Sequence, residues 1–167
     1  MDKDAARILI TTYYNLQKQR IRIGNQLFAL SQNSKQSMML EAMHAQLEAQ
    51  EEIIKKSLDQ WTLRTSAGQW LRSIHGIGPV LAAGLIAFID IKKAKSYGSV
   101  HRYAGLDPTC VWRKGEKCPW NRDLKNIAYK CGLSFVKSSG SEGAFYGKRI
   151  YFRAFTLQKA LTQPLRM

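Results

Sequence analysis

Near the middle of the chain, residues 74–83 run Ile74-His75-Gly76-Ile77-Gly78-Pro79-Val80-Leu81-Ala82-Ala83. Two glycines stand two positions apart between aliphatic residues, a pattern that favours a tight turn leading into a helix. Pro79 fits the first position of that helix, where its missing N–H costs nothing. The bare amides of Gly76 and Gly78 can then meet a phosphate at the helix N-terminus. With a helix expected at 69–73, the pattern predicts a helix-hairpin-helix that binds nucleic acid. The alternative is a close helix crossing that small residues make possible.

Apolar residues recur at seven-residue spacing in the part of the chain that precedes this turn. The two series are Leu9, Leu16, Ile23 and Leu30, then Leu40, Leu47, Ile54 and Trp61. The polar turn Ser31-Gln32-Asn33-Ser34 separates them, so we expect two long helices folded into an antiparallel coiled-coil hairpin. Polar Gln50 and Ser57, together with Gly24, interrupt the seam. Apolar surface is therefore left to pack either against a second copy or against the chain's own globular part.

The expected fold is mainly all-α and has two parts. Residues 1–66 are expected to form an antiparallel coiled-coil hairpin for dimerisation and RNA contact, and residues 67–167 a basic helix-hairpin-helix domain that binds nucleic acid. In the second part we expect helices at 79–89, 100–105, 123–137 and 144–161. Gly105 is expected to end the second of these helices as a glycine C-cap, and Asp123 to cap the start of the third. The segment near 110–121 is expected to be irregular or β-like, and residues 138–143 to be a linker.

Charge is distributed unevenly along the chain. There are 26 Lys and Arg against 12 Asp and Glu, but residues 1–60 hold eight basic and seven acidic side chains. Almost the whole excess therefore lies after residue 60. The nearly neutral residues 1–60 suit a structural or pairing element. The basic residues 61–167 suit the binding of a polyanion, because each cation placed on a phosphate releases condensed counterions. The alternative is a basic surface that serves only solubility.

Tryptophans and cations are interleaved after residue 110, which supplies stacking surfaces and phosphate contacts together. We expect residues 112–125 to form one basic ledge, and one of Trp112 and Trp120, but not both, to be exposed. The candidate nucleic-acid-binding residues are the two turn glycines and the basic or aromatic residues that follow them, namely Gly76, Gly78, Lys92, Lys93, Lys95, Arg102, Trp112, Arg113, Lys114, Lys117, Trp120, Asn121, Arg122, Lys125 and Lys130.

No set of residues predicts catalysis or metal binding, and we expect neither a cofactor nor a metal. The acidic residues of the basic half, such as Asp90 and Asp107, fall at helix ends and turns, where they have structural roles. The three cysteines lack C-x-x-C spacing, so they predict neither disulfides nor a zinc site, although His101 would complete a four-ligand set. The longest apolar run, residues 80–89, is too short to span a bilayer. The protein is therefore expected to be soluble and cytoplasmic, with no membrane partner.

Two longer strings carry a family resemblance. The first is Leu71-Arg72-Ser73-Ile74-His75-Gly76-Ile77-Gly78-Pro79-Val80-Leu81-Ala82-Ala83, and the second is Tyr103-Ala104-Gly105-Leu106-Asp107-Pro108. They resemble the C-terminal, Transposase_20-like region of the bridge-RNA-guided insertion-sequence transposases, in which a coiled coil precedes a helix-hairpin-helix of the form GIGP…A and then AGL.P. The same order runs here from about residue 5 to residue 137. The Nop domains of box C/D ribonucleoproteins, and the Tas proteins that use tandem interspaced guide RNAs, are similar in architecture.

Two features depart from that family. The transposases begin with a RuvC-like domain bearing an acidic tetrad, and no room for one is expected before the coiled coil of this chain. They also carry a serine, usually within Ser-Gly, soon after AGL.P, whereas residues 109–121 contain no serine. The resemblance therefore implies the nucleic-acid-holding half of the family, with the chemistry removed or supplied by another protein.

These observations give one leading hypothesis and two alternatives. We expect a non-catalytic homodimer that forms a ribonucleoprotein with a structured guide RNA and through it recognises target DNA. It would act in the cytoplasm or nucleoid of a prokaryote, encoded there or by a phage, with any nuclease supplied by a separate protein. The first alternative is a degenerate or partial transposase that acts in DNA transposition. The second is a plain DNA-binding helix-hairpin-helix protein, which would prefer duplex DNA to structured RNA.

Overall fold

The computed structural model describes residues 1–33, 35, 37–92, 94 and 96–149. Within these residues the protein is helical and contains no strand, which confirms the all-α prediction. The helices are α1 (Lys3–Gln32), α2 (Met38–Leu63), α3 (Ser66–Ser73), α4 (Pro79–Phe88), α5 (Tyr97–Tyr103) and α6 (Arg122–Lys137). Residues 145–149 are helical as well. The rest of the helix predicted at 144–161, from residue 150 onward, lies outside the described residues.

The predicted hairpin is present as α1 and α2, and both helices begin at side-chain caps. Asp2 accepts a hydrogen bond from the amide of Ala5, and Ser37 accepts one from the amide of Leu40. The turn falls later than the predicted residues 31–34, because Ser31 and Gln32 remain helical and Asn33 is the C-cap. The Ser31 hydroxyl donates to the carbonyl of Phe28, a bond that keeps this serine compatible with a helix.

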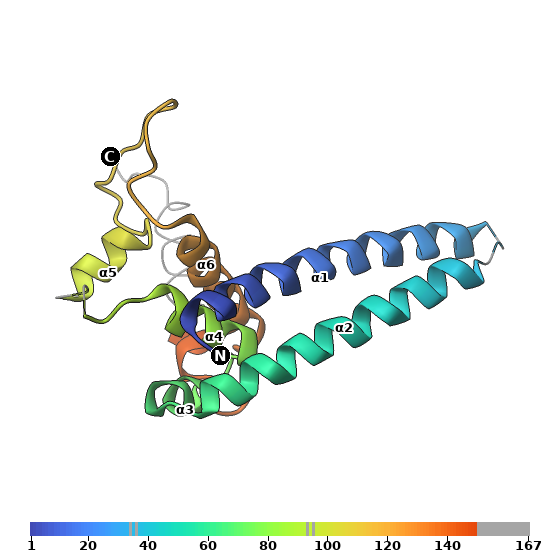
Figure 1. Cartoon of the computed structure of the whole chain (residues 1–167), viewed down its shortest axis with the longest axis horizontal. Helices are drawn as coiled ribbons and strands as arrows, with labels where there is room; N and C mark the ends of the chain where they lie inside the picture. The colour runs from blue at the N-terminus through green and yellow to red at the C-terminus, as the bar shows by residue number, and fades with distance from the viewer. Residues whose placement is uncertain (34, 36, 93, 95, 150–167) are drawn as a thin grey trace, which may run out of the picture.

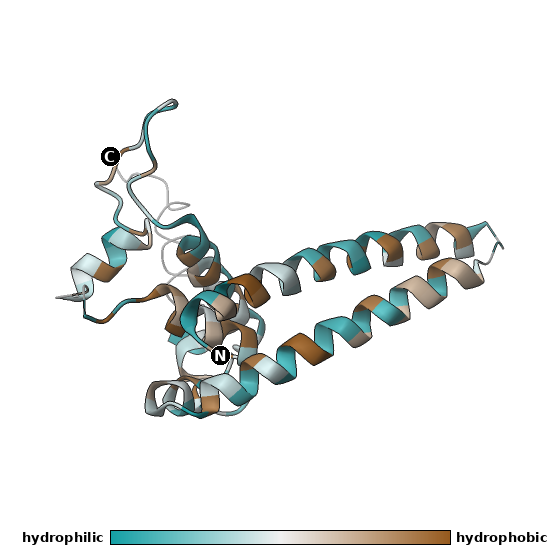
Figure 2. Ribbon diagram, viewed as in Figure 1, coloured by the Kyte–Doolittle hydropathy of each residue, from teal (hydrophilic) through white to brown (hydrophobic). Residues whose placement is uncertain are grey.

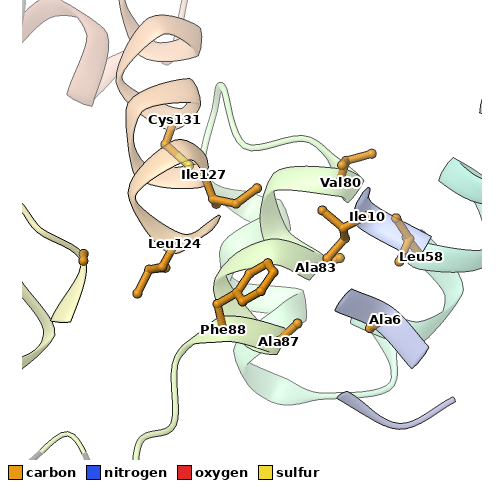
Figure 3. Close-up of a cluster of buried hydrophobic side chains, with 11 residues drawn as sticks. Ala6, Ile10, Leu58, Val80, Ala83, Ala87, Phe88, Leu124, Ile127 and Cys131 are labelled. Carbon is orange, nitrogen blue, oxygen red and sulfur yellow. The ribbon is translucent and has the colours of Figure 1, made fainter. Parts of the chain in front are cut away.

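The hydrophobic core lies where the base of the hairpin meets α4. Figure 1 shows the hairpin projecting from a body that contains α3, α4 and α6, and α4 packs against both α1 and α2. Phe88 of α4 stands between side chains of α1 and α6 in the close-up of Figure 3. The core therefore contains residues from both sides of the predicted boundary between residues 66 and 67. Helix α3 begins at Ser66, close to that boundary. Its members are Ala6, Ile10, Leu58, Val80, Ala83, Ala87, Phe88, Ala104, Leu124, Ile127 and Cys131.

Away from the body, the hairpin seam is thin. Ile23 is buried, but the other residues of the two heptad series are only partly buried. Glu51 is the buried charge of the seam and accepts two hydrogen bonds from Arg20, at 2.7 and 3.2 Å. Figure 2 shows hydrophobic residues continuing along both helices to the tip. Several of them remain exposed, namely Ile21, Phe28, Met38, Met39, Met43 and Ile53.

A second projection leaves the body on the side away from the hairpin. It contains α5 and the irregular loop 104–121 that follows, which Figure 1 shows beyond α4 and α6. Ala104 ties this projection to the core and is only 3% exposed. The segment near 110–121, for which irregular and β-like structure were both open, is a loop with turns and no strand. Across the described residues, no helix combines the length and apolarity needed to cross a bilayer.

Candidate nucleic-acid interface

The glycine turn joins α3 to α4 as predicted, but Gly76 is turned toward the body. Its φ of +95° lies in the region that favours glycine. The Ser134 hydroxyl of α6 donates to the Gly76 carbonyl at 2.6 Å, and a Cβ on Gly76 would approach the Phe135 ring at 2.9 Å. Gly76 therefore permits a close contact with α6, which is the packing role that the sequence left open as the alternative.

Gly78 occupies the open side of the same turn. It is the N-cap of α4, with Pro79 directly after it, and no side chain caps this helix. A Cβ at Gly78 would meet nothing within 4 Å. Arg72 steadies the turn by donating to the Ile77 carbonyl at 3.0 Å and to Asp59 at 2.8 Å. The α4 N-terminus thus has no side-chain cap and has open space beside Gly78, and phosphate contact there stays a prediction.

Gly105 ends α5 and supports a tryptophan. The predicted glycine C-cap is a complete Schellman motif, in which the amides of Gly105 and Leu106 donate to the carbonyls of Arg102 and His101, each at 3.0 Å. The φ of Gly105 is +64°. A Cβ here would lie 2.6 Å from Cγ of Trp120, so the missing side chain is what lets the indole rest on the backbone. One glycine therefore both ends the helix and seats the ring.

Trp112, Trp120, Arg122 and Lys125 gather into one surface, which we call the tryptophan platform. The two indoles meet edge to face, with centroids 6.4 Å apart. The Arg122 guanidinium lies over Trp112 at 5.6 Å, and the Lys125 ammonium lies over Trp120 at 4.6 Å. Trp112 is exposed and Trp120 is partly buried, which confirms that only one of the two is exposed. The tryptophan platform therefore lies within residues 112–125, where the basic ledge was predicted.

Asn121 connects the platform to α5 and α6. Its Oδ1 accepts from the amide of Leu124 and caps α6, so the predicted cap at Asp123 was wrong. Asp123 lies in the first turn instead, where its charge still suits the helix dipole. Asn121 also donates from Nδ2 to the Tyr103 hydroxyl at 3.0 Å, and its amide donates to the Tyr103 carbonyl at 2.8 Å. Tyr103, an exposed aromatic beside the platform, was missed by the sequence analysis, although it begins the string that matches AGL.P.

The remaining predicted cations are placed differently from one another. Arg113, Lys114 and Lys117 are exposed on the loop beside Trp112, and Lys92 is exposed after α4. Arg102 is exposed but pairs with Asp107 at 3.2 Å. Lys93 and Lys95 lie outside the described residues.

Lys130 does not belong to the platform. Its ammonium lies 3.9 Å from the centre of the Tyr14 ring of α1, and the lysine is partly buried there. Burial raises the pKa of the Tyr14 hydroxyl. Lys130 therefore fastens α6 to the hairpin, a role that its position in a basic stretch of sequence does not reveal.

The platform is electropositive at the position of a neighbouring thiol. The Cys118 sulfur lies 3.4 Å from the Trp120 carbonyl oxygen. Desolvation opposes ionisation of this thiol, but the Trp120 main chain and the charges of Arg122 and Lys125 outweigh it, so the pKa of Cys118 lies below its usual range.

The acidic and thiol groups of the described residues do not gather into a site. Asp107 accepts hydrogen bonds from the Thr109 hydroxyl and amide, which with Arg102 hold its pKa below the usual range. Asp59 is engaged by Arg72. In the described part of the chain, no three His, Cys, Asp or Glu side chains are placed to hold a metal ion. Cys131 lies in the core, where burial raises its pKa to about 11, rather than beside Cys110 and Cys118.

The fold and the platform define an all-α protein in which the body carries a glycine turn and the second projection carries an aromatic, cationic loop. Residues 68–112 match the model of the transposase IS116/IS110/IS902 family. The match runs from α3 through the glycine turn, α4 and α5 to Trp112, so this part of the chain is similar to a region of those transposases and supports a transposase-related role. The hairpin and α6 lie outside it. No curated protein and no solved structure matches the chain.

Proposed function

We propose that the protein is a non-catalytic nucleic-acid-binding protein that forms a ribonucleoprotein with a structured guide RNA and through it recognises DNA. The observation that carries this proposal is the tryptophan platform at the end of the region that is similar to the transposases, with Arg113, Lys114 and Lys117 exposed beside it. Cations bind phosphates whatever the sequence, and aromatic faces accept bases that are not paired. A structured RNA offers both, because its helices carry phosphates and its loops carry unpaired bases.

The carboxylates of the described residues support the non-catalytic part of the proposal. Asp59, Asp107 and Glu51 each accept hydrogen bonds from an arginine of the fold. Strand cleavage or joining would then require a separate nuclease or recombinase. The guide RNA would read the DNA by base pairing, while the protein would recognise the shape and backbone of the RNA.

The proposal includes a homodimer formed through the hairpin and a location in the cytoplasm or nucleoid of a prokaryote. The hairpin supports self-association because its net charge is small and it leaves Phe28, Met39 and Met43 exposed. A nearly neutral surface attracts a polyanion weakly and suits a protein partner. The basic body then remains free for nucleic acid.

A comparison of ligands at matched salt tests this proposal. The protein is purified from its native host and washed at high salt, and the RNA that remains bound is sequenced. That RNA is then used as a binding probe, and a DNA duplex of equal length is the comparison. We expect a discrete small RNA that binds more tightly than the duplex. Random DNA fragments, or no retained nucleic acid, would contradict the guide-RNA hypothesis.

Charge removal shows whether the loop is the contact surface. The triple variant Arg113→Ala, Lys114→Ala, Lys117→Ala should weaken RNA binding and reduce the slope of log affinity against log salt by up to about three, one for each lost phosphate contact. Lys18→Ala with Lys35→Ala and Lys56→Ala is the matched control, because it also removes three cations and all three lysines are exposed on the hairpin. Equal loss in the two variants would mean that only net charge matters.

A second candidate is a degenerate or partial transposase, which the match of residues 68–112 favours. This candidate predicts that the purified protein joins or breaks DNA strands when given supercoiled DNA that carries the ends of its own locus. Products of strand transfer would establish it. A plain DNA-binding helix-hairpin-helix protein would instead bind the duplex more tightly than the structured RNA.

A further inference from the structure

Trp112 has a fixed ring and an exposed surface at the same time. Its Nε1–H donates to the Glu116 carbonyl at 2.9 Å, and its ring meets that of Trp120 in an edge-to-face arrangement. The residue is nevertheless 38% exposed. Since the polar N–H is already satisfied within the loop, the part left for a ligand is apolar π surface. A ring held in this way loses little side-chain entropy when something stacks on it.

The cations around Trp112 specify the kind of ligand. Arg122 lies over the ring at 5.6 Å, and Lys125 is held nearby over Trp120. Lys114 and Lys117 are exposed in the loop that follows. An apolar peptide would leave these charges without partners, whereas a nucleotide places a flat base on the ring and its phosphate among the cations. Arg122 and Lys125 also contribute to the lowered pKa of the nearby Cys118 thiol.

We propose that Trp112 is the stacking surface for an unpaired nucleobase, with Arg122 and Lys125 holding the phosphates of the same strand. The site would therefore take a single-stranded segment of RNA or DNA, such as a loop. A duplex cannot satisfy it, because its bases already stack on one another and present no free face. This inference rests on the proposed nucleic-acid-binding function and assigns the strandedness of the ligand.

Trp70 provides a matched control for the test. It lies on α3, is 62% exposed and has no place in the platform. The experiment measures the affinity of wild type, Trp112→Ala, Trp112→Phe and Trp70→Ala for one short RNA and one short DNA, each as a single strand and annealed to its complement. A base analogue in the probe, 2-aminopurine, reports stacking directly through the quenching of its fluorescence.

We expect Trp112→Ala to weaken single-strand binding by roughly five- to a hundredfold, which is the range for losing one base–aromatic stack. Trp112→Phe should lose less, because a smaller ring remains. Duplex affinity should change less than twofold in both variants, and Trp70→Ala should leave every affinity and the quenching unchanged. A stronger effect on the RNA strand than on the DNA strand would identify the natural ligand as RNA.

Three results would overturn the inference. Equal losses for single strands and duplexes would mean that Trp112 only supports the loop, and circular dichroism of Trp112→Phe would show whether the fold is retained. Unchanged single-strand affinity in Trp112→Ala would refute stacking while leaving nucleic-acid binding intact. Wild-type protein that binds none of the probes would refute the proposed function as well, so the two failures are distinguishable.

Discussion

At the scale of single residues, Gly105 combines a positive φ with a close approach to a side chain. Alanine there would take a φ of +64° and place its Cβ 2.6 Å from Trp120 Cγ. We expect Gly105→Ala to lower the free energy of unfolding by about 1–3 kcal/mol through backbone strain and displacement of the indole. Thermal unfolding followed by tryptophan fluorescence measures both effects.

Gly98→Ala in α5 is the control for that variant. Its φ is ordinary, and its Cβ would reach no closer than 4.0 Å to a neighbour, the Ser96 hydroxyl. Because alanine favours a helix over glycine, this change should be neutral or slightly stabilising. If Gly105→Ala melts and fluoresces like wild type, the indole does not depend on the close approach.

The glycine turn shows why residue roles were only partly predictable. Spacing and flanking residues predicted the turn and the start of α4, both of which are local properties. The same local pattern predicts one role for Gly76 and Gly78, that of turn residues whose amides bind phosphate. In the structure, however, Gly76 faces Phe135 and Gly78 faces open space. That difference comes from α6, which is distant in the sequence and has no signal within residues 74–83. Lys130 and Tyr14 were unpredictable as partners for the same reason.

At the scale of elements, the hairpin depends on the ion pair between Arg20 of α1 and Glu51 of α2. Both carboxylate oxygens accept from the guanidinium, and the Glu51 side chain is only 8% exposed. Arg20→Ala would leave a buried carboxylate without its partner. We expect a loss of about 2–4 kcal/mol in the free energy of unfolding, measured by denaturant titration.

The double variant Arg20→Met, Glu51→Leu distinguishes two quantities. One is the stability lost when a single partner is removed and the other remains buried, and the other is the net contribution of the ion pair to the free energy of unfolding. Replacing both partners by apolar residues should restore most of the stability. If Arg20→Ala alone is neutral, the pair is not a determinant of how α1 and α2 align. Helix positions were predictable because caps and heptads are local, whereas a buried Arg–Glu pair at this seam depends on how the two helices are paired.

The direction of the loop after α5 was also beyond prediction. Its composition predicted a basic ledge, and its irregular structure gives no periodicity from which its path can be derived. The contacts that fix that path join residues far apart in the sequence, such as Tyr103 with Asn121. Sequence therefore predicted the chemistry of the platform but not its geometry.

At the scale of the whole molecule, a nearly neutral hairpin and a basic projection leave the core in different directions. A groove of about 500 Å³ runs between α1 and α2 near the middle of the hairpin. Ile23, Met43 and Leu47 give it apolar character, and Arg22 is its one charged lining residue. The remaining lining residues are glutamines, Gln19, Gln26, Gln46 and Gln50. Such a groove suits a helix of similar character, and the same hairpin in a second copy presents one under two-fold symmetry.

If the proposed homodimer forms through this groove, charges placed in it should separate the copies. We expect Met43→Glu with Gln50→Glu to convert a dimer into a monomer, because the paired surfaces would bury four like charges, for which the groove offers only the Arg22 of each copy. Ala45→Glu with Ala49→Glu places the same charges on exposed positions of α2 that do not line the groove, and should remain dimeric. Size-exclusion chromatography with light scattering measures the mass of each. A wild-type protein that is monomeric at every concentration would contradict the homodimer, and a dimer that survives Met43→Glu with Gln50→Glu would place its interface outside the groove.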